Sequence, residues 1–371
     1  MISKMTFTLS TKPLADALAL GVVNANISKF NNRSCIAQIT ATRTGLTINL
    51  EPNLIVTEIR LKGMGDSDSQ EVRFVDSLLF KQLVSTFETN TISIEFVEGG
   101  IVLHSGKSKF NLANITESDG SLNKPEMGDY GDDGIVIDKS KWSFIKNRQQ
   151  QFASMAFLHP VYTRYYINDS GDVLIGDFDQ SVFSHSSKGT LGETCLISDT
   201  ILNLICSVPD GAKIKKISNG YQIHVTTDSF ELISDFHPEH EEDEGIGSYN
   251  SDIILSLLQK TAQYVKIPSR AVEKILKQSE LLSRSSEDSI MFGVQNGVAF
   301  FEGSNIDGKI DIEGNKDVNF KVEFKLKLLS QVLTNYPGDT IYVGPMIQDD
   351  EVVGIVTWDD DIEVVLAGKD D

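Results

Sequence analysis

Few residues in this chain have the types and spacing that metal chemistry requires. His237, Glu239 and His240 lie close together in the sequence, and imidazole and carboxylate groups are usual zinc ligands. Pro238 interrupts the group and no further ligand is near in the sequence, so an acidic connector is the favoured interpretation. Residues 168–172 resemble half of a calcium loop, but a hairpin turn explains their Asn, Asp, Ser and Gly content better.

Catalytic and nucleotide-binding motifs are also missing from the sequence. It contains no GxxxxGK[ST] and no GxGxxG run, and nothing places Ser, His and Asp residues as a triad. Cys35, Cys195 and Cys206 are odd in number and lack CxxC spacing, which favours buried thiols over a disulfide frame or metal site. We therefore expect no enzymatic activity, no metal and no cofactor.

The charge of the chain argues at first against a nucleic-acid partner. The 371 residues carry a formal net charge of −20, whereas phosphate binding requires Lys and Arg. Net charge does not describe how the charges are distributed along the chain, however, and two predicted helical stretches are locally basic. The cations of these stretches are Lys139, Lys141, Lys146 and Arg148, and then Lys260, Lys266, Arg270, Lys274 and Lys277. From the residues alone, solvated helix faces are the favoured interpretation.

Repetition is the strongest organisational signal. The hydrophobic pattern predicts a strand, a helix and three strands, and this unit recurs six times. Phe80, Leu202 and Leu329 occupy equivalent places in three of the units. The predicted helices are 13–23, 76–84, 139–152, 198–205, 253–264 with 271–282, and 324–333. These helices and strands predict a protein of the α+β class.

The six units pair into three predicted domains, 1–130, 131–245 and 246–371. Connectors 117–133 and 237–247 are acidic and rich in turn residues, a composition typical of solvated linkers. No apolar run is long enough to span a bilayer, and the N-terminus lacks a signal-peptide core. A cytoplasmic location is the default expectation.

Three stretches carry a resemblance to a known family. Residues 99–112 lead from a strand into Ser-Gly-Lys-Ser-Lys-Phe-Asn-Leu, which is similar to the S-G-[RK]-S-[RK]-F-x-L run of bacterial beta clamps. Residues 164–168 resemble the R-Y-Y-L-N of that family, and Arg33 sits where the family has an Arg before its second strand. Over essentially its whole length the chain resembles the DNA polymerase III beta subunit, or beta sliding clamp. The divergence of the motifs favours a distant or phage-encoded member.

The resemblance implies a DNA-clamp fold and its partners. Three-domain subunits would form a head-to-tail homodimer, a ring with helices inside and sheets outside that encircles duplex DNA. A clamp loader and a replicative DNA polymerase would bind it, the latter through a short linear motif. The implied DNA-facing residues are Arg33, Lys139, Lys141, Lys146, Arg148, Lys266, Arg270, Lys274 and Lys277.

The resemblance also implies a peptide pocket. Its residues would be Ile167, Gln180, Val182, Pro238, Val364, Val365 and Leu366. The family's His-Arg pair is Gln180-Ser181 here, so a less positive pocket is expected. An ordinary core strand is the alternative for residues 364–366.

Two other functions remain open from the sequence. One is a hydrolase with unrecognised catalytic groups, against which the sixfold repetition counts. The other is a repeat-built structural protein of a phage particle, for which repeated β domains and acidic surfaces are common. The mass of the protein in solution distinguishes a clamp from these alternatives, because a clamp forms a discrete dimer rather than a filament or shell.

Overall fold

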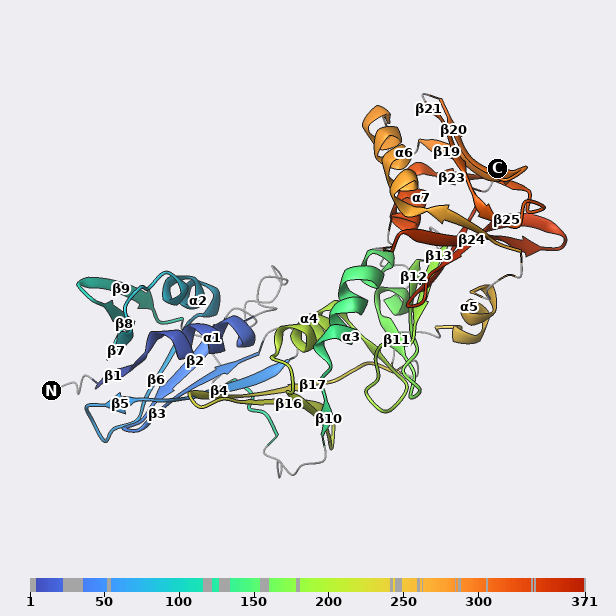
Figure 1. The fold of residues 1–371 in the computed structure, drawn as a ribbon. Coiled ribbons are helices and arrows are strands. Elements are labelled where there is room, and N and C mark those ends of the chain that lie inside the picture. Colours follow the sequence, from blue (N-terminus) through green and yellow to red (C-terminus); the bar gives the residue numbers. More distant parts are fainter. Residues whose placement is uncertain are drawn as a thin grey trace. The chain divides into compact units, whose positions relative to one another are not determined.

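The computed structural model describes residues 5–22, 36–51, 55–115, 122–126, 134–153, 160–177, 181–240, 243, 249–258, 261, 263–283, 285, 288–304, 306–334, 336 and 338–369. The chain divides into two compact units (Figure 1). One comprises Met1–Trp142 with Thr200–Pro238, and the other Ser143–Asp199 with Glu239–Asp371. The three predicted domain boundaries stay a prediction.

Short helices alternate with antiparallel strands in the first unit. Its elements are β1 (Met5–Ser10), α1 (Thr11–Gly21), β2 (Ile36–Ala41), β3 (Gly45–Leu50), β4 (Val56–Lys62), β5 (Met64–Gly65), β6 (Glu71–Asp76), α2 (Ser77–Ser85), β7 (Thr91–Val97), β8 (Gly100–Ser105), β9 (Ser108–Ala113), β10 (Ile135–Val136), most of α4 (Asp199–Ser207), β15 (Lys213–Ile217), β16 (Gly220–Thr226) and β17 (Phe230–Phe236). The carboxylate of Asp76 accepts the N–H of Leu79 at 2.8 Å and so begins α2.

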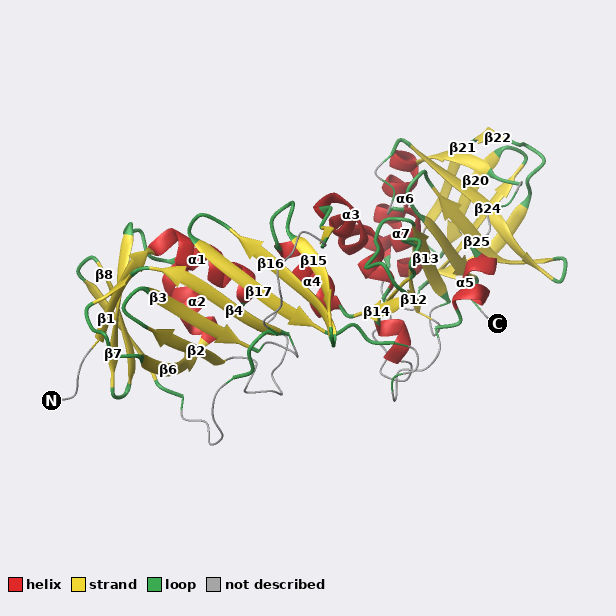
Figure 2. Cartoon of the chain, turned by 90° about the horizontal axis from the view of Figure 1, so that it is seen from below, coloured by secondary structure: helices red, strands yellow, loops and turns green. Residues whose placement is uncertain are grey.

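The strands of the first unit form two sheets. One has the order β5-β1-β7-β8-β9 and the other β10-β15-β16-β17-β4-β3-β2-β6. Helix α1 packs against α2 and contacts β4 and β17, and both helices lie on the same face of the larger sheet (Figure 2). Along β7 the buried residues Ile92, Ile94 and Phe96 alternate with residues of intermediate burial, so one side of the smaller sheet faces the core.

The second unit repeats this plan. Its elements are η4 (Ile145–Gln149), η5 (Gln150–Phe152), η6 (Pro160–Thr163), β11 (Tyr165–Ile167), β12 (Val173–Asp177), β13 (Val182–Ser186), β14 (Cys195–Ile197), α5 (Ser251–Leu257), β18 (Val265–Pro268), α6 (Ser269–Leu282), β19 (Ser289–Gln295), β20 (Val298–Gly303), β21 (Ile306–Asp311), β22 (Glu313–Gly314), β23 (Phe320–Lys325), α7 (Leu326–Leu333), β24 (Thr340–Gln348), β25 (Glu351–Trp358) and β26 (Glu363–Ala367). Helix α3 (Lys139–Phe144) spans the division between the units.

The strands of the second unit also form two sheets. Their orders are β14-β11-β12-β13-β26-β25-β24-β18-β22 and β21-β20-β19-β23. Helices α6 and α7 pack on each other, and α7 contacts β26. No helix within the described ranges has the length and apolar character that crossing a membrane requires.

The predicted α+β class and the sixfold repeat are confirmed. In chain order the six units begin at β1, β6, β10, β14, β18 and β23, and a helix and then three strands follow each of these strands, with the two-residue strands β5 and β22 and the helix α5 as additions to the repeat. The last strands of four units pair within the chain, β4 with β17 and β13 with β26. The last strands of the other two, β9 and β21, end their sheets.

One predicted helix boundary was wrong, and another predicted helix has the predicted extent but an irregular second half. The helix predicted over 253–264 ends at Leu257, and the chain enters strand β18 at Val265 because Val265 pairs with Val343 of β24. The helix predicted over 139–152 continues from Phe144 as a π-helical and then a 3₁₀ turn.

Part of the connector 117–133 is also not solvated as predicted. Residues 122–126 dock on the larger sheet of the first unit. The N–H of Leu122 donates to Gln38 at 3.0 Å and that of Glu126 to Asp235 at 2.5 Å. Leu122 is itself buried, so apolar burial and satisfied backbone groups outweigh the solvation that composition suggested.

Candidate DNA-facing and partner-binding surfaces

Helix α6 presents the exposed cations predicted for the third domain. Val272 and Leu276 are buried, whereas Arg270, Lys274 and Lys277 are exposed, since residues three and four apart share a helix face. Two of these cations have acidic neighbours: Lys277 Nζ lies 2.5 Å from Glu273, and Arg270 lies 3.9 Å from Asp339. The exposed surface of α6 is therefore basic, but Glu273 and Asp339 partly neutralise its positive charge.

Two further predicted cations of the second unit lie over aromatic rings. Lys266 on β18 places Nζ 5.4 Å from the centre of the Tyr342 ring, a cation–π distance. Arg148 lies 5.0 Å from the ring centre of Phe144 and 5.4 Å from that of Tyr336.

Arg148 differs most from its predicted role. Its side chain donates to Asp359 at 2.9 Å, and the residue is only 9% exposed. Burial raises the pKa of the neighbouring Tyr336 hydroxyl above its usual value, although its hydrogen bond with Thr357 opposes this. Asp359 and two rings hold Arg148 inside the second unit, so little of its side chain is exposed in this structure, and its assignment to the DNA-facing set stays a prediction.

The remaining predicted cations lie near α3 or outside the described residues. Lys141 is exposed, 3.9 Å from Asp138, and Lys139 and Lys146 are half-buried. A hydrogen bond from Ser140 lowers the pKa of the Asp138 carboxyl. Arg33 and Lys260, named from the sequence, fall outside the described residues. The DNA-facing set stays a prediction.

The predicted peptide-pocket residues lie on two faces of the nine-stranded sheet. Val182 pairs with Leu366, and Phe183 pairs with Val365, and directly paired residues point to the same side. The side of Val182 and Leu366 also carries Ile167 and Val364.

Each face is covered by different elements. On the Val364 side, Gln149 of η4 donates to Ser184 at 3.4 Å, and Tyr336 bonds to Thr357. On the Val365 side, Tyr249 and the residues of α5 complete an apolar cluster.

As placed, the apolar pocket residues are core residues. Ile167, Val182, Val364, Val365 and Leu366 are all 3% exposed or less. The alternative of a core strand therefore describes residues 364–366 in this structure. Pro238 is buried in the first unit, and Gln180 lies outside the described residues. A pocket accessible to a peptide stays a prediction.

A histidine joins β13 to β26 at the same junction. His185 contacts Asp172 at 3.1 Å and Glu363 at 3.3 Å through its two ring nitrogens. Burial alone lowers the pKa of His185, but the hydrogen bonds and charges of both carboxylates outweigh it and raise that pKa above 6.5. Burial likewise raises the pKa of Asp172, while bonds from Asn168, Ser187 and His185 bring it down to about 2.

The two candidate metal sites discounted from the sequence have structural roles. Glu239 forms an ion pair with Arg164 at 2.6 Å, and its backbone bridges to Leu196. Asn168 accepts the N–H of Asp172 at 2.8 Å and closes the turn between β11 and β12. The part of the chain that the structure describes holds no cluster of three or more His, Cys, Asp or Glu residues placed to bind a metal.

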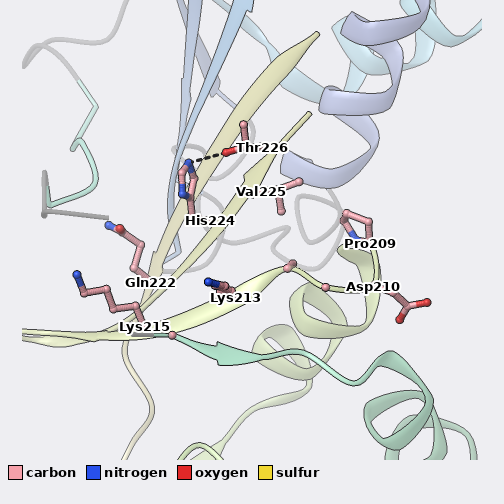
Figure 3. A pocket seen from close by; sticks show the side chains of 11 residues that line it. Pro209, Asp210, Lys213, Lys215, Gln222, His224, Val225 and Thr226 are labelled. Carbon is pink, nitrogen blue, oxygen red and sulfur yellow. Dashed lines mark hydrogen bonds between the residues drawn. The ribbon is translucent and has the colours of Figure 1, made fainter. Parts of the chain in front are cut away.

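Sequence reasoning missed a basic concavity on the first unit. It has a volume of about 320 Å³ and is lined by Lys213 and Lys215 of β15 and by Gln222, His224 and Thr226 of β16 (Figure 3). The alternation Lys-Ile-Lys after a Pro-Asp-Gly turn was the available signal, because period two places both lysines on one face.

Comparison with known proteins defines the class of fold. No protein-family model and no curated protein matches the chain. Solved structures match it over essentially its whole length. The beta sliding clamp of Caulobacter crescentus matches at 13% sequence identity and a TM-score of 0.74, with 100% of both chains covered. The DNA polymerase III beta chain of Streptococcus pneumoniae matches at 16% sequence identity and a TM-score of 0.75, with 99% of this chain and 100% of that one covered.

A third match is the DNA polymerase III beta subunit of Thermotoga maritima, at 12% identity and a TM-score of 0.75, with 99% of each chain covered. The chain therefore has the α+β fold of the sliding clamps. Its particular fold is that of the DNA polymerase III beta subunit, and the resemblance seen in the sequence is confirmed at the level of fold.

Proposed function

We propose that the protein is a DNA sliding clamp, a non-enzymatic ring of two head-to-tail copies that encircles duplex DNA and confers processivity on a replicative polymerase. One observation carries the proposal. Four of the six repeated units pair through their last strands, and the two remaining last strands, β9 and β21, end their sheets. Pairing β9 of one copy with β21 of another would repeat the internal junctions and close a ring.

The side chains around the two end strands support this contact. Leu281 and Leu282, at the end of α6, are 85% and 50% exposed, and Leu282 lines a small groove together with Ile306 at the start of β21. Exposed neighbouring leucines are unusual on a surface that meets only water. On β9, Phe110 is partly exposed, and Lys109 contributes a cation.

Charge across the proposed contact is complementary. The turn and strand at 107–109 carry Lys107 and Lys109, whereas β21 carries Asp307 and Asp311 beside Lys309. A main-chain ladder between end strands supplies the remaining attraction. The contact is heterologous, since a different surface of each copy takes part.

The proposed relation to DNA is topological. A chain with a net charge of −20 binds free duplex poorly, and the exposed cations Lys141, Arg270, Lys274 and Lys277 would make weak, sequence-independent phosphate contacts. Weak contacts allow sliding, while ring closure prevents dissociation. A cytoplasmic location fits this role.

Partners would bind through short linear motifs. The Helicobacter pylori beta clamp, which matches at a TM-score of 0.69 and 13% identity with 98% of this chain and 100% of that one covered, was solved bound to a DNA ligase peptide. By analogy we propose that a polymerase and a clamp loader bind this protein. Since the apolar residues of the predicted pocket are buried, a peptide would reach them only after local movement.

Loading onto circular DNA tests the proposal. The labelled protein, mixed with its clamp loader, ATP and a nicked circular duplex, is expected to co-elute with the circle through a gel-filtration column and to be released when a restriction enzyme linearises it. Equal retention on linear and circular DNA would contradict a topological link. The alternative of a phage structural protein predicts filaments or shells in particle images instead of rings.

A further inference from the structure

The turn that leads from β25 into β26 bears acidic side chains at alternate positions. Each of these carboxylates contacts a cation on the β13 side of the sheet. The three contacts join Asp359 to Arg148 of η4 at 2.9 Å, Asp361 to Lys188 at 2.5 Å, and Glu363 to His185 of β13 at 3.3 Å. We call these three contacts the ionic row. It joins segments that are far apart in the sequence, and so it holds the start of β26 against β13.

The cations of the ionic row are held by further contacts. Arg148 and Lys188 both lie over the ring of Phe144, at 5.0 and 5.4 Å from its centre. The second ring nitrogen of His185 contacts Asp172 at 3.1 Å. The side chains of Arg148, His185 and Lys188 are 11%, 18% and 29% exposed. Solvent and salt screen such partly buried charges less than charges on the open surface.

The ionic row is not needed to close the turn. The Asp359 carboxylate already accepts the N–H of Ile362 at 2.9 Å. In the first unit, the equivalent turn between β16 and β17 closes in a similar local way, because the Thr227 hydroxyl accepts the N–H of Phe230 at 3.0 Å. Contacts to the β13 side are therefore an addition to a turn that local hydrogen bonds already define.

The strand held by the ionic row carries the predicted peptide-pocket residues. β26 begins at Glu363, and the next three residues, Val364, Val365 and Leu366, are 2% exposed or less. A peptide reaches these side chains only if the strand or its surroundings move. Contacts at the first residue of the strand and in the turn before it are therefore placed to control that movement.

We propose that the ionic row is a pH-responsive latch that controls the opening of β26 and thereby the access of an apolar peptide to the buried residues of this strand. The role of the peptide rests on the proposed function, whereas the latch is a property of the chain itself. Protonated His185 attracts the carboxylates on both of its sides, and neutral His185 does not. Arginine and lysine keep their charge near neutral pH, so the latch weakens as pH rises but does not vanish.

The groups that face His185 leave it as the titrating member of the latch. Bonds from Asn168, Ser187 and His185 bring the pKa of Asp172 down to about 2, against the effect of burial, so Asp172 stays charged near neutral pH. Lys188, beyond Ser187 in the chain, is directed to Asp361. Burial raises the pKa of the Tyr336 hydroxyl, which therefore stays neutral. Histidine is the side chain whose charge ordinarily changes in this pH range.

Hydrogen exchange in the full chain tests the latch. Deuterium uptake by β26 (Glu363–Ala367) is followed by mass spectrometry, with β19 (Ser289–Gln295), a strand of the other sheet of the same unit, as the internal reference. We expect β26 to exchange faster than β19 and to respond weakly to low urea, because a local opening exposes little surface. Exchange of both strands at the same rate and with the same urea dependence would show that β26 does not open locally, and would overturn the proposal.

H185Q separates the titratable contact from the permanent ones. At about pH 6 we expect β26 of H185Q to exchange about threefold or more faster than that of the wild type, whereas at about pH 8.5 the two should agree within about twofold. K188M removes a charge that persists over this range, so it should speed the exchange at both pH values.

The matched control is H224Q, which removes a histidine that contacts Glu231 at 2.8 Å in the first unit. It should leave the exchange of β26 unchanged at both pH values. Equal exchange in wild type and H185Q at the lower pH, or the same ratio between them at both pH values, would overturn the latch. The experiment needs no DNA, loader or peptide, so a negative result here is distinct from a failure of the loading test.

Discussion

The last strands of the repeated units differ in one respect: β4, β17, β13 and β26 have partners in the chain, whereas β9 and β21 end their sheets. The paired junctions contain buried polar contacts, such as the Thr57–Ser234 hydroxyl bond of 2.9 Å. The end strands instead have exposed leucines and charges nearby. Equivalent strands thus serve folding in one place and, in our proposal, assembly in the other.

Removing a paired strand should have the largest effect. Deletion of residues 364–371 removes most of β26, including Val364, Val365 and Leu366, which are 2% exposed or less. The loss of each buried side chain lowers the free energy of unfolding by about 2–5 kcal/mol. The sum is therefore comparable with the whole free energy of unfolding of a domain, about 5–15 kcal/mol. We expect the second unit to lose cooperative melting in calorimetry. Deleting only residues 370–371 is the control, and an unchanged melt of the longer deletion would show that β26 is dispensable.

Changing the leucines beside the end strand β21 should abolish association without unfolding the chain. L281D/L282D places charges where the leucines are 85% and 50% exposed, so we expect the stability of the folded monomer to change little. Sedimentation should show monomer where the wild type shows dimer, and both should melt alike at dilutions where both are monomeric. I253D, at another exposed apolar position, is the control. A dimeric L281D/L282D would refute the assigned contact.

The ion pairs of the β4–β17 junction should have an intermediate effect. Arg60 bonds to Glu58 at 2.6 Å and to Glu231 at 3.0 Å, and the Glu58 side chain is 8% exposed. R60M leaves the buried Glu58 carboxylate without the guanidinium of Arg60. We therefore expect the free energy of unfolding, measured in urea, to fall by about 1–3 kcal/mol. The control R43M breaks an exposed pair with Asp68 and should cost under about 0.5 kcal/mol. Equal costs would show that burial does not matter here.

The His185 contact should make the β13–β26 junction mildly pH-dependent. Because the folded pKa of His185 is raised, its stabilisation is complete below pH 6.5 and is lost as pH rises through the folded value. Asp172, with its pKa lowered to about 2, loses its contribution only as pH falls towards that value.

We expect the second unit to melt a few degrees higher near about pH 6 than near about pH 8.5. H185Q should remove this difference, and H224Q, in the first unit, should keep it. A pH dependence that survives H185Q would assign the effect to another group.

The sequence predicted the repeated fold better than the sites. Alternating apolar residues in β7 and the Asp76 cap of α2 are local signals that a short stretch of sequence contains. The pairing of Val182 with Leu366 joins residues far apart in the chain, so their burial could not be read from either segment. The burial of Arg148 could not be predicted for the same reason, since its partner Asp359 is distant in sequence. Lys213 and Lys215 were visible as an alternation, but only the fold puts His224 beside them.

A mixing experiment tests the head-to-tail contact most directly. The F110D chain has a defective β9 surface and an intact β21 surface, and the L281D/L282D chain has the reverse. Each alone should sediment as a monomer of 40.9 kDa. An equimolar mixture should form a species of twice that mass, since one intact β9 surface meets one intact β21 surface. A mixture that stays monomeric at concentrations where the wild type is dimeric would contradict the account.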